Sequence, residues 1–252
     1  YYCSNHSGMG GQVNPTTTLG SSNFDGTIQS VVKASPTAGF SIIKYTGNGS
    51  DGATIGHGLG VKPDFIVIKK RANNTGGNTG NWIVQHKSLT NGVNATSSLF
   101  TLTSYSNAAI YLNGNYTQSS YGFDNQVNGN TDTFVAYCFS EVAGYSKFGS
   151  YTGNGSSDGV FVFLGFRAAF IMIKSSSLET DWDIITADID GYNVVTKYLN
   201  ANQSSAEGTY TYLDILSNGF KARNVGNSFN QSGASYIYMA FAESPFRNAR
   251  AR

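Results

Sequence analysis

The pentapeptide Gly155-Ser156-Ser157-Asp158-Gly159 has the spacing of a nucleophile elbow, the motif that presents a catalytic serine in many acyl hydrolases. An elbow needs its serine at a sharp turn between a strand and a helix, because this turn aims the hydroxyl at a base. Here the pentapeptide precedes an apolar run typical of a strand, and no helical pattern follows it. We therefore interpret Ser157 as a turn residue and not as a nucleophile.

The three histidines, His6, His57 and His86, do not form a set that could bind a metal ion or transfer protons. His57 lies in a glycine-rich run and His86 ends a strand-like run, and neither has partners at metal-ligand spacing. We expect backbone groups to satisfy their rings. The glycine-rich run, residues 56–60, also lacks the strand and the helix that flank a phosphate-binding loop.

Acidic residues cluster at Asp181, Asp183, Asp188 and Asp190. Alternation along a strand places the first two on one face and the last two on another, where nearby carbonyl groups could complete a calcium site. The spacing is not that of an EF-hand loop, so we favour an exposed acidic edge. A glycosidase would need two acids at a defined separation across a cleft, and the sequence does not place them. We predict no catalytic, metal-binding or cofactor-binding residue and no cofactor.

Two tryptophans, Trp82 and Trp182, recur at equivalent positions of two strand-like runs. A duplicated tryptophan in a strand is typical of a hydrophobic core, whereas an exposed one could stack on a sugar ring. We favour the core. The 16 tyrosines, some of them in loops such as 104–107 and 115–117, resemble the composition of adaptable binding surfaces.

These residues belong to a duplicated framework. The hexapeptide Tyr-Thr-Gly-Asn-Gly-Ser occurs at residues 45–50 and again at 151–156, and each copy is followed by an Asp-Gly pair, an apolar run and a tryptophan. Each copy closes on an aromatic run that ends in an acid, Glu141 or Glu243, for which we expect a role in the fold. An offset of about 100 residues is too long for a solenoid repeat and indicates two whole domains.

Short strand-like runs at a spacing of about ten residues, separated by Gly- and Asn-rich turns, indicate an all-β chain. We predict two tandem, duplicated antiparallel β-sandwich domains, jelly-roll-like, at residues 39–146 and 147–252, the second ending in a short basic tail. Residues 1–38 are rich in Gly, Ser, Asn and Thr. They are predicted to form an extended arm or linker that adds a strand to a neighbour.

The charge of the chain is low: 12% of residues are charged, and the formal net charge is +1. A surface of neutral amides and hydroxyls suits assembly with copies of the same chain or contact with sugars. A Gly- and Asn-rich β domain also needs many turn residues, which is the simpler explanation of the composition. Without a long basic run we expect no nucleic-acid partner.

No apolar run reaches the length of a membrane span, so we expect no insertion into a membrane.

The two cysteines, Cys3 and Cys138, do not make a disulfide framework, and Cys138 is expected to be a small buried residue. The chain starts at Tyr1 and not at a methionine, which is typical of a processed product or of part of a longer chain.

A set of motifs resembles a phage-encoded domain of unknown function. The set comprises residues 39–42, the hexapeptide at 45–50, the run Gly56-His57-Gly58-Leu59-Gly60-Val61-Lys62-Pro63 and the ending Ala240-Phe241-Ala242-Glu243-Ser244-Pro245-Phe246. The resemblance covers residues 27–252. It implies a structural protein of a tailed-phage virion, of the tail-fibre type, and it carries over no catalytic residue.

We therefore expect a virion structural protein that is not an enzyme, part of a tail fibre or a decoration of the capsid exterior. The expected partners are copies of itself in a homotrimer, other virion proteins and a host-surface glycan. The protein would be assembled in the cytoplasm of the host bacterium, carried on the virion and extracellular after release. One alternative is a polysaccharide depolymerase or esterase that uses Ser157, His86 and the acids at 181–190. Another is a bacterial surface or filament protein of the same fold.

Overall fold

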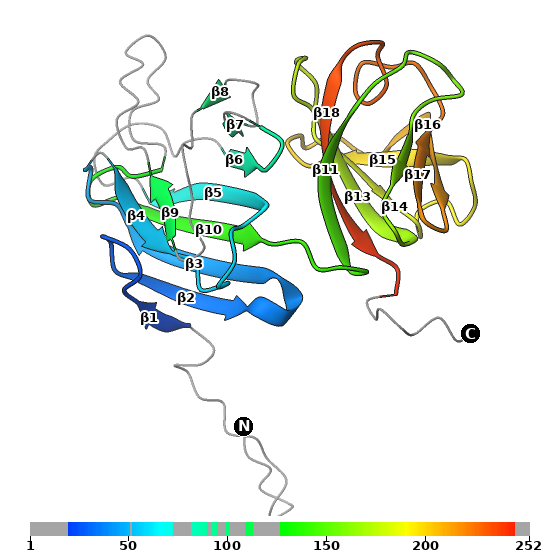
Figure 1. Cartoon of the computed structure of the whole chain (residues 1–252). Coiled ribbons are helices and arrows are strands. Elements are labelled where there is room, and N and C mark those ends of the chain that lie inside the picture. Colours follow the sequence, from blue (N-terminus) through cyan, green and yellow to red (C-terminus); the bar gives the residue numbers. More distant parts are fainter. Residues whose placement is uncertain are drawn as a thin grey trace, which may run out of the picture. The chain divides into compact units, whose positions relative to one another are not determined.

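The protein is nearly all β in the computed structural model (Figure 1), which describes residues 20–50, 52–72, 82–89, 92–94, 99–100, 109–112 and 127–244. The prediction of an all-β, antiparallel and duplicated fold is confirmed. Within these residues no helix is long and apolar enough to cross a membrane. The helical element that is described is a single 3-10 turn, η1 (Pro36–Ala38).

The strands of the first repeat, with the two that precede it, are β1 (Ser21–Asn23), β2 (Ser30–Ser35), β3 (Phe40–Thr46), β4 (Ala53–Gly56), β5 (Phe65–Ala72), β6 (Trp82–His86), β7 (Gly92–Asn94), β8 (Leu99–Phe100), β9 (Ala109–Leu112) and β10 (Thr133–Phe139). The strands of the second repeat are β11 (Ser146–Thr152), β12 (Phe161–Phe163), β13 (Ala168–Ser175), β14 (Asp183–Thr186), β15 (Val195–Asn200), β16 (Gly208–Leu216), β17 (Gly219–Ala222) and β18 (Ser235–Ala242).

The strand order shows that the two repeats share one topology. The first sheet runs β1-β2-β3-β10-β5-β6-β7-β8, and the second runs β11-β18-β13-β14-β15-β16-β17-β12. The stretch β3-β10-β5-β6-β7 therefore has the same order as β11-β18-β13-β14-β15. In each repeat the strand that follows the hexapeptide is paired with a later strand of the same repeat, β4 with β9 and β12 with β17.

The N-terminal segment differs from the predicted arm. Residues 21–23 and 30–35 form β1 and β2, and β2 pairs antiparallel with β3 from Val31 opposite Lys44 to Ser35 opposite Phe40. The boundary predicted at residue 38 therefore lies inside a sheet. Alternating burial along β2 explains this, since Ser30 and Val32 face the interior.

The compact units of the chain do not follow the predicted boundaries at residues 39–146 and 147–252. The first unit takes the described residues within 1–62, 68–80 and 104–138, and the second takes those within 63–67, 81–103 and 139–252. The second unit thus includes the start of β5 and all of β6 from the first repeat. The reason is a hydrophobic cluster that joins Phe65 and Val84 to Phe148, Trp182 and Met239.

Strand β13 of the second repeat is covered on both faces inside the second unit. Ile171 and Ile173 of β13 belong to the main core, together with residues such as Leu213 and Phe220. Phe170 and Met172, at the alternate positions, pack against the cluster of Phe65 and Trp182. Because successive side chains of a strand point to opposite faces, a strand with two covered faces carries a continuous apolar run, as β13 does from Ala168 to Ile173.

Each hexapeptide forms what we call a latch, a set of hydrogen bonds between residues 45–50 or 151–156 and the loop before the closing strand. The Tyr45 hydroxyl donates to the Val127 carbonyl, and the Asn128 side chain accepts from the Asn48 amide at 3.0 Å and donates to the Ser50 carbonyl at 2.9 Å. The latch therefore holds the turn after β3 to the loop before β10.

Glycine is required at the first latch glycine of each repeat. A Cβ on Gly47 would lie 2.2 Å from the Gly129 carbonyl oxygen, and a Cβ on Gly153 would lie 2.3 Å from the Gln231 carbonyl oxygen. Any larger residue would force the two backbone segments apart. The hexapeptide is thus explained by backbone packing, and no catalytic role is needed to account for its recurrence.

Candidate binding cleft

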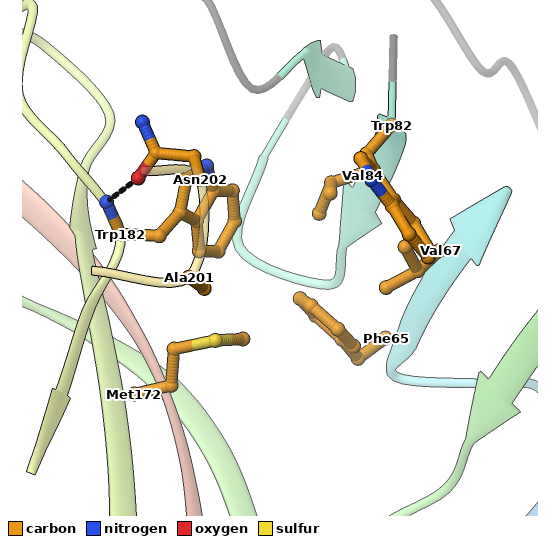
Figure 2. A pocket seen from close by; sticks show the side chains of 8 residues that line it. All are labelled: Phe65, Val67, Trp82, Val84, Met172, Trp182, Ala201 and Asn202. Carbon is orange, nitrogen blue, oxygen red and sulfur yellow. Dashed lines mark hydrogen bonds between the residues drawn. The ribbon is translucent and has the colours of Figure 1, made fainter. Parts of the chain in front are cut away.

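A small apolar cleft of about 230 Å³ lies within the second unit (Figure 2). Both tryptophans of the chain line it, one from each repeat. The lining residues are Phe65, Val67, Trp82, Val84, Met172, Trp182, Ala201 and Asn202. In Figure 2 the side chains of Trp182, Ala201, Asn202 and Met172 form one wall, and those of Trp82, Val84, Val67 and Phe65 form the other.

Strand alternation and one turn position these side chains. Phe65 and Val67 are alternate residues of β5, and Trp82 and Val84 are alternate residues of β6, so each pair points to one face of its strand. Trp182 stands just before β14 and is held by the turn after β15. Its backbone N–H donates to the Asn202 Oδ1 at 2.9 Å, and its carbonyl accepts from the Ala201 N–H at 2.9 Å.

The two tryptophans differ in exposure. Trp182 is 5% exposed and belongs to the hydrophobic cluster, so the prediction of a core residue is confirmed for it. Trp82 is 43% exposed, and the prediction of a core residue is wrong there. Trp82 is the first residue of β6 and the one exposed residue of that strand. An exposed indole at the mouth of an apolar cleft is a feature of binding sites.

The cleft suits an apolar ring and does not suit acid–base chemistry. None of its eight described lining residues is an acid, a base or a nucleophile. The one polar side chain, Asn202, already uses both amide atoms, because its Nδ2 donates to Asp181 Oδ1 at 2.8 Å while its Oδ1 accepts from Trp182. A ligand here would be held by contact with carbon atoms and by ring stacking.

His86 is buried, and both of its ring nitrogens are bonded to backbone. Its Nδ1 accepts from the Ser88 N–H at 3.1 Å, which leaves the proton on Nε2 to donate to the Tyr238 carbonyl at 3.1 Å. Burial lowers the pKa of His86 to about 4. The ring is therefore neutral at pH 7 and has no free lone pair for a general base. His57 is also buried, and its Nδ1 accepts from the Leu59 N–H at 3.2 Å.

The four acids of the 181–190 segment are not gathered into one site. Asp181 accepts from Asn202 and from Gln203, while Asp190 accepts from the backbone N–H groups of Thr196 and Lys197. Asp183 is 1% exposed, so the prediction of an exposed acidic edge is wrong for it. Within the described part of the chain no group of three or more His, Cys, Asp or Glu side chains could hold a metal ion.

Asp183 has the most unusual environment of these acids. Burial raises its pKa to about 7, although the hydrogen bond from Asn200 acts in the opposite direction. Its Oδ1 accepts from the Asn200 Nδ2 at 2.7 Å. The carboxyl is enclosed and does not line the cleft, so a substrate in the cleft would not reach it.

Ser157 lies in an exposed bend that leads to β12, and the segment that follows it is a strand. The hydroxyl of the neighbouring Ser156 accepts from the Asp158 N–H at 3.1 Å, and Asp158 pairs with Lys221 at 2.5 Å. The strand-to-helix turn of a nucleophile elbow is therefore absent at this described position.

The closing acids and the remaining predictions can be placed in the same way. Glu141 pairs with Lys87 at 2.7 Å, and Glu243 pairs with Arg167 at 2.9 Å, so each closing acid holds a cation of its own unit. Cys138 is buried and is a free thiol. Predictions for Cys3, His6, the tyrosines of 104–107 and 115–117 and the terminal residues Arg247, Arg250 and Arg252 lie outside the described residues.

Comparison with known proteins gives one family and no named relative. The model of a family described as Domain of unknown function (DUF7483) matches residues 15–245, so the chain belongs to this family. The match spans both repeats and both latches. No curated protein and no solved structure matches the chain.

Proposed function

We propose that this member of the DUF7483 family is a structural protein of a phage virion that works by assembling and binding, and not by catalysis. It would form part of a tail fibre or of the capsid exterior. The virion setting rests on the motifs at 39–63 and 240–246 that resemble a phage-encoded domain. The homotrimer, the other virion proteins and the extracellular location after release are parts of the same proposal.

The non-enzymatic role is supported by the positions and hydrogen bonds of the side chains that could take part in catalysis. Ser157 lies in an open bend, and the His86 ring is bonded to backbone on both sides. Asp183 is enclosed, and Asp190 is bonded to backbone amides. A triad or a carboxylate pair would need these groups to converge around a substrate. The cleft instead offers carbon surfaces, which support binding.

Localisation on particles tests the virion setting. Purified phage particles would be labelled with an antibody to the chain and imaged at low resolution, with proteomics of the same particles. The proposal predicts labels at the tail or on the capsid exterior. Labels on the surface of uninfected bacteria, with none on particles, would support a bacterial surface or filament protein instead.

Activity on host polysaccharide tests the absence of catalysis. The intact chain would be incubated with capsule or with acylated polysaccharide, and release of reducing ends or of acyl groups would be followed. We expect no turnover above buffer. Turnover that is lost in Ser157→Ala and kept in the neighbouring control Ser156→Ala would establish the enzyme and remove the proposal.

Contact with a host-surface glycan is a separate part of the proposal. Trp82 supports it, because a half-exposed indole can stack on the apolar face of a sugar. A glycan array, probed with the intact chain and with Trp82→Ala, measures it. Binding that weakens in the variant is the expected result, and no binding at all would leave assembly alone.

A further inference from the structure

Phe24 is the most unusual exposed side chain of the first unit. It lies at the tip of the β1–β2 hairpin and is 72% exposed. Single exposed apolar residues are common on protein surfaces, but most of them are mobile or partly covered by neighbours. A fully presented aromatic ring on a fixed backbone is instead a candidate anchor for a partner.

The backbone around Phe24 is held at both ends. On one side the Asn23 Oδ1 accepts from the Asp25 N–H at 2.9 Å, and the Asn23 Nδ2 donates to the Asp25 carboxylate at 3.0 Å. On the other side the backbone N–H groups of Thr27 and Thr54 donate to each other's hydroxyl oxygens at 2.9 Å and 2.8 Å. The tip is thus preorganised, and it presents a ring that is 72% exposed.

The backbone of the tip packs closely against β4. A Cβ on Gly26 would lie 2.4 Å from the Thr54 carbonyl oxygen, so the tip already touches β4 with no room for a further side chain. A Cβ on Gly56 would likewise meet the Asn23 side chain. The tip is thus fixed in place on β4, and covering its exposed Phe24 ring with another surface would be favourable.

The cleft of the second unit has the size and the chemistry of a receptor for one ring. Its volume of about 230 Å³ is below the roughly 300–1,000 Å³ of clefts that hold drug-sized ligands. Its walls are two indoles, a phenyl ring and aliphatic groups, and its one amide is already hydrogen-bonded. A ring without polar atoms fits inside it, whereas a sugar would contact only its exposed edge at Trp82, through the apolar face of the sugar ring.

We infer that Phe24 of one copy inserts into the cleft between Trp82 and Trp182 of a second copy. The inference rests on the proposed assembly function and names its contact. We call the Phe24 side chain the knob and the cleft the hole. The knob lies in the first unit and the hole in the second, so the contact is heterologous: each copy inserts its knob into one neighbour and receives the knob of another. Such contacts close into rings, including a trimer, or continue as filaments.

Other exposed aromatic residues fit the cleft less well. Tyr192 is 88% exposed, but it carries a hydroxyl that would lose its hydration against the largely apolar walls of the cleft. Phe163 is 58% exposed and lies in a strand, β12, where it does not project from a tip. Both residues are useful as matched controls, because they change exposed aromatic area without removing the proposed knob.

A mixing experiment with two full-length variants tests the contact. Phe24→Ala removes the knob and keeps the hole, while Ala201→Glu places a carboxylate at the exposed wall of the cleft and keeps the knob. Sedimentation velocity should show each variant alone to associate at least about 30-fold more weakly than the native chain, as expected for loss of an interface anchor. An equimolar mixture should form 1:1 dimers with near-native affinity, because one intact knob meets one intact hole.

Controls separate this contact from general changes of the surface. Tyr192→Ala and Phe163→Ala remove exposed rings elsewhere, and Ser205→Glu adds the same charge to an exposed position outside the cleft. All three should associate like the native chain. Circular dichroism should show an unchanged β spectrum for every variant, since the substituted side chains are exposed.

Two results would overturn the inference in different ways. If the native chain assembles and Phe24→Ala assembles equally well, the named contact is wrong and the assembly function stands. If the native chain is a monomer at every concentration up to about 100 μM, both the named contact and the proposed assembly function are rejected. Failure of the mixed variants to recover dimers, when each alone is impaired, would also reject a knob-and-hole contact.

Discussion

The two repeats keep one latch and differ in their buried polar groups. The tyrosine hydroxyl donates to a loop carbonyl at 2.7 Å in each repeat, from Tyr45 to Val127 and from Tyr151 to Phe229. The same tyrosine stacks on an aromatic ring of the closing strand. The ring centroids are 5.0 Å apart for Tyr45 and Phe134, and 5.1 Å apart for Tyr151 and Tyr236. Because the backbone geometry is nearly identical, the hexapeptide reports a structural constraint and not a shared ligand.

The two repeats differ in which of their equivalent buried positions carry charged side chains. Lys70 and Asp132 form a buried ion pair at 2.8 Å, and the corresponding residues of the second repeat are the uncharged Ser175 and Ala234. Conversely, Asp183 occupies the position that Ile83 has in the first repeat, and both are 1% exposed. The framework therefore tolerates different polar groups at equivalent buried positions: Lys70 and Asp132 pair with each other, and Asp183 is held through one carboxylate oxygen by Asn200.

The largest effect should come from breaking the ion pair that only the first repeat has. Asp132→Ala leaves the Lys70 ammonium buried, and such a loss typically costs about 3–5 kcal/mol. We expect a fall of this size in the free energy of unfolding, measured by urea denaturation. The double variant Lys70→Ser with Asp132→Ala copies the second repeat and should be more stable than Asp132→Ala alone. Equal or lower stability of the double variant would contradict the equivalence of the two sites.

The latch asparagines should give the next largest effect and distinguish the repeats. Asn128 donates to Asn48 and Ser50, whereas Asn230 donates to Asn154, Ser156 and also Asn224. We expect replacement by alanine to cost about 2–4 kcal/mol at each site, since several buried hydrogen bonds are lost. Asn230→Ala should cost about 1 kcal/mol more, because its two amide hydrogens serve three acceptors and the variant leaves the additional one, the Asn224 carbonyl, without this donor. Equal unfolding free energies for the two variants would show that this bond contributes nothing.

The pH dependence of stability should reveal a cancellation between the repeats. The pKa of Asp183 is raised to about 7, so the folded chain binds this proton more tightly than the unfolded chain does. The stability that this proton contributes is therefore lost as the pH rises from about 4 to 7. The lowered pKa of His86, about 4, means that the unfolded chain binds that proton more tightly, so stability is lost as the pH falls from about 6.5 to 4. Between about pH 4 and pH 6.5 the changes of stability with pH that Asp183 and His86 cause therefore have opposite signs.

Single variants separate the two slopes. Asp183→Asn should make the chain lose stability on acidification, by up to about 1.4 kcal/mol per pH unit between pH 6.5 and 4. His86→Gln should make stability fall as the pH rises from about 4 to 7. Urea midpoints at four pH values between 4.5 and 7.5 measure both. Parallel curves for the native chain and the two variants would contradict the assigned pKa directions.

The smallest effect should come from the latch tyrosines, where the repeats are alike. Tyr45→Phe and Tyr151→Phe each remove one hydrogen bond to a carbonyl and keep the stacked ring, at a cost of about 1 kcal/mol. Thermal unfolding of both variants should give similar shifts. A clear difference between the two would show that the latches are not equivalent in energy, although they are alike in geometry.

The fold class could be read from the sequence because its signals are local. Repetition of the hexapeptide and short β-branched runs between glycine-rich turns predict a duplicated all-β chain. The pairing of β2 with β3 was not predicted, because the composition of residues 1–38 is that of a linker. Strand pairing there depends on a partner strand, and composition does not report partners.

The candidate cleft was less predictable. Its walls come from β5, β6, β13 and the turn after β15, and no local pattern brings these segments together. Trp82 and Trp182 were recognised as equivalent, but their different exposure depends on which neighbours cover each of them. Asp183 was misassigned for a similar reason: alternation gives the face of a strand, and only packing decides that the face is buried. Alternation of Phe65 with Val67 is the signal that could have indicated one wall.

The self-assembly of the chain is the claim on which the functional account depends most. Mass photometry and sedimentation velocity of the intact native chain, from nanomolar to high micromolar concentration, test it directly. The account predicts a concentration-dependent oligomer, with a trimer as the expected closed form. A strict monomer across this whole range would contradict it.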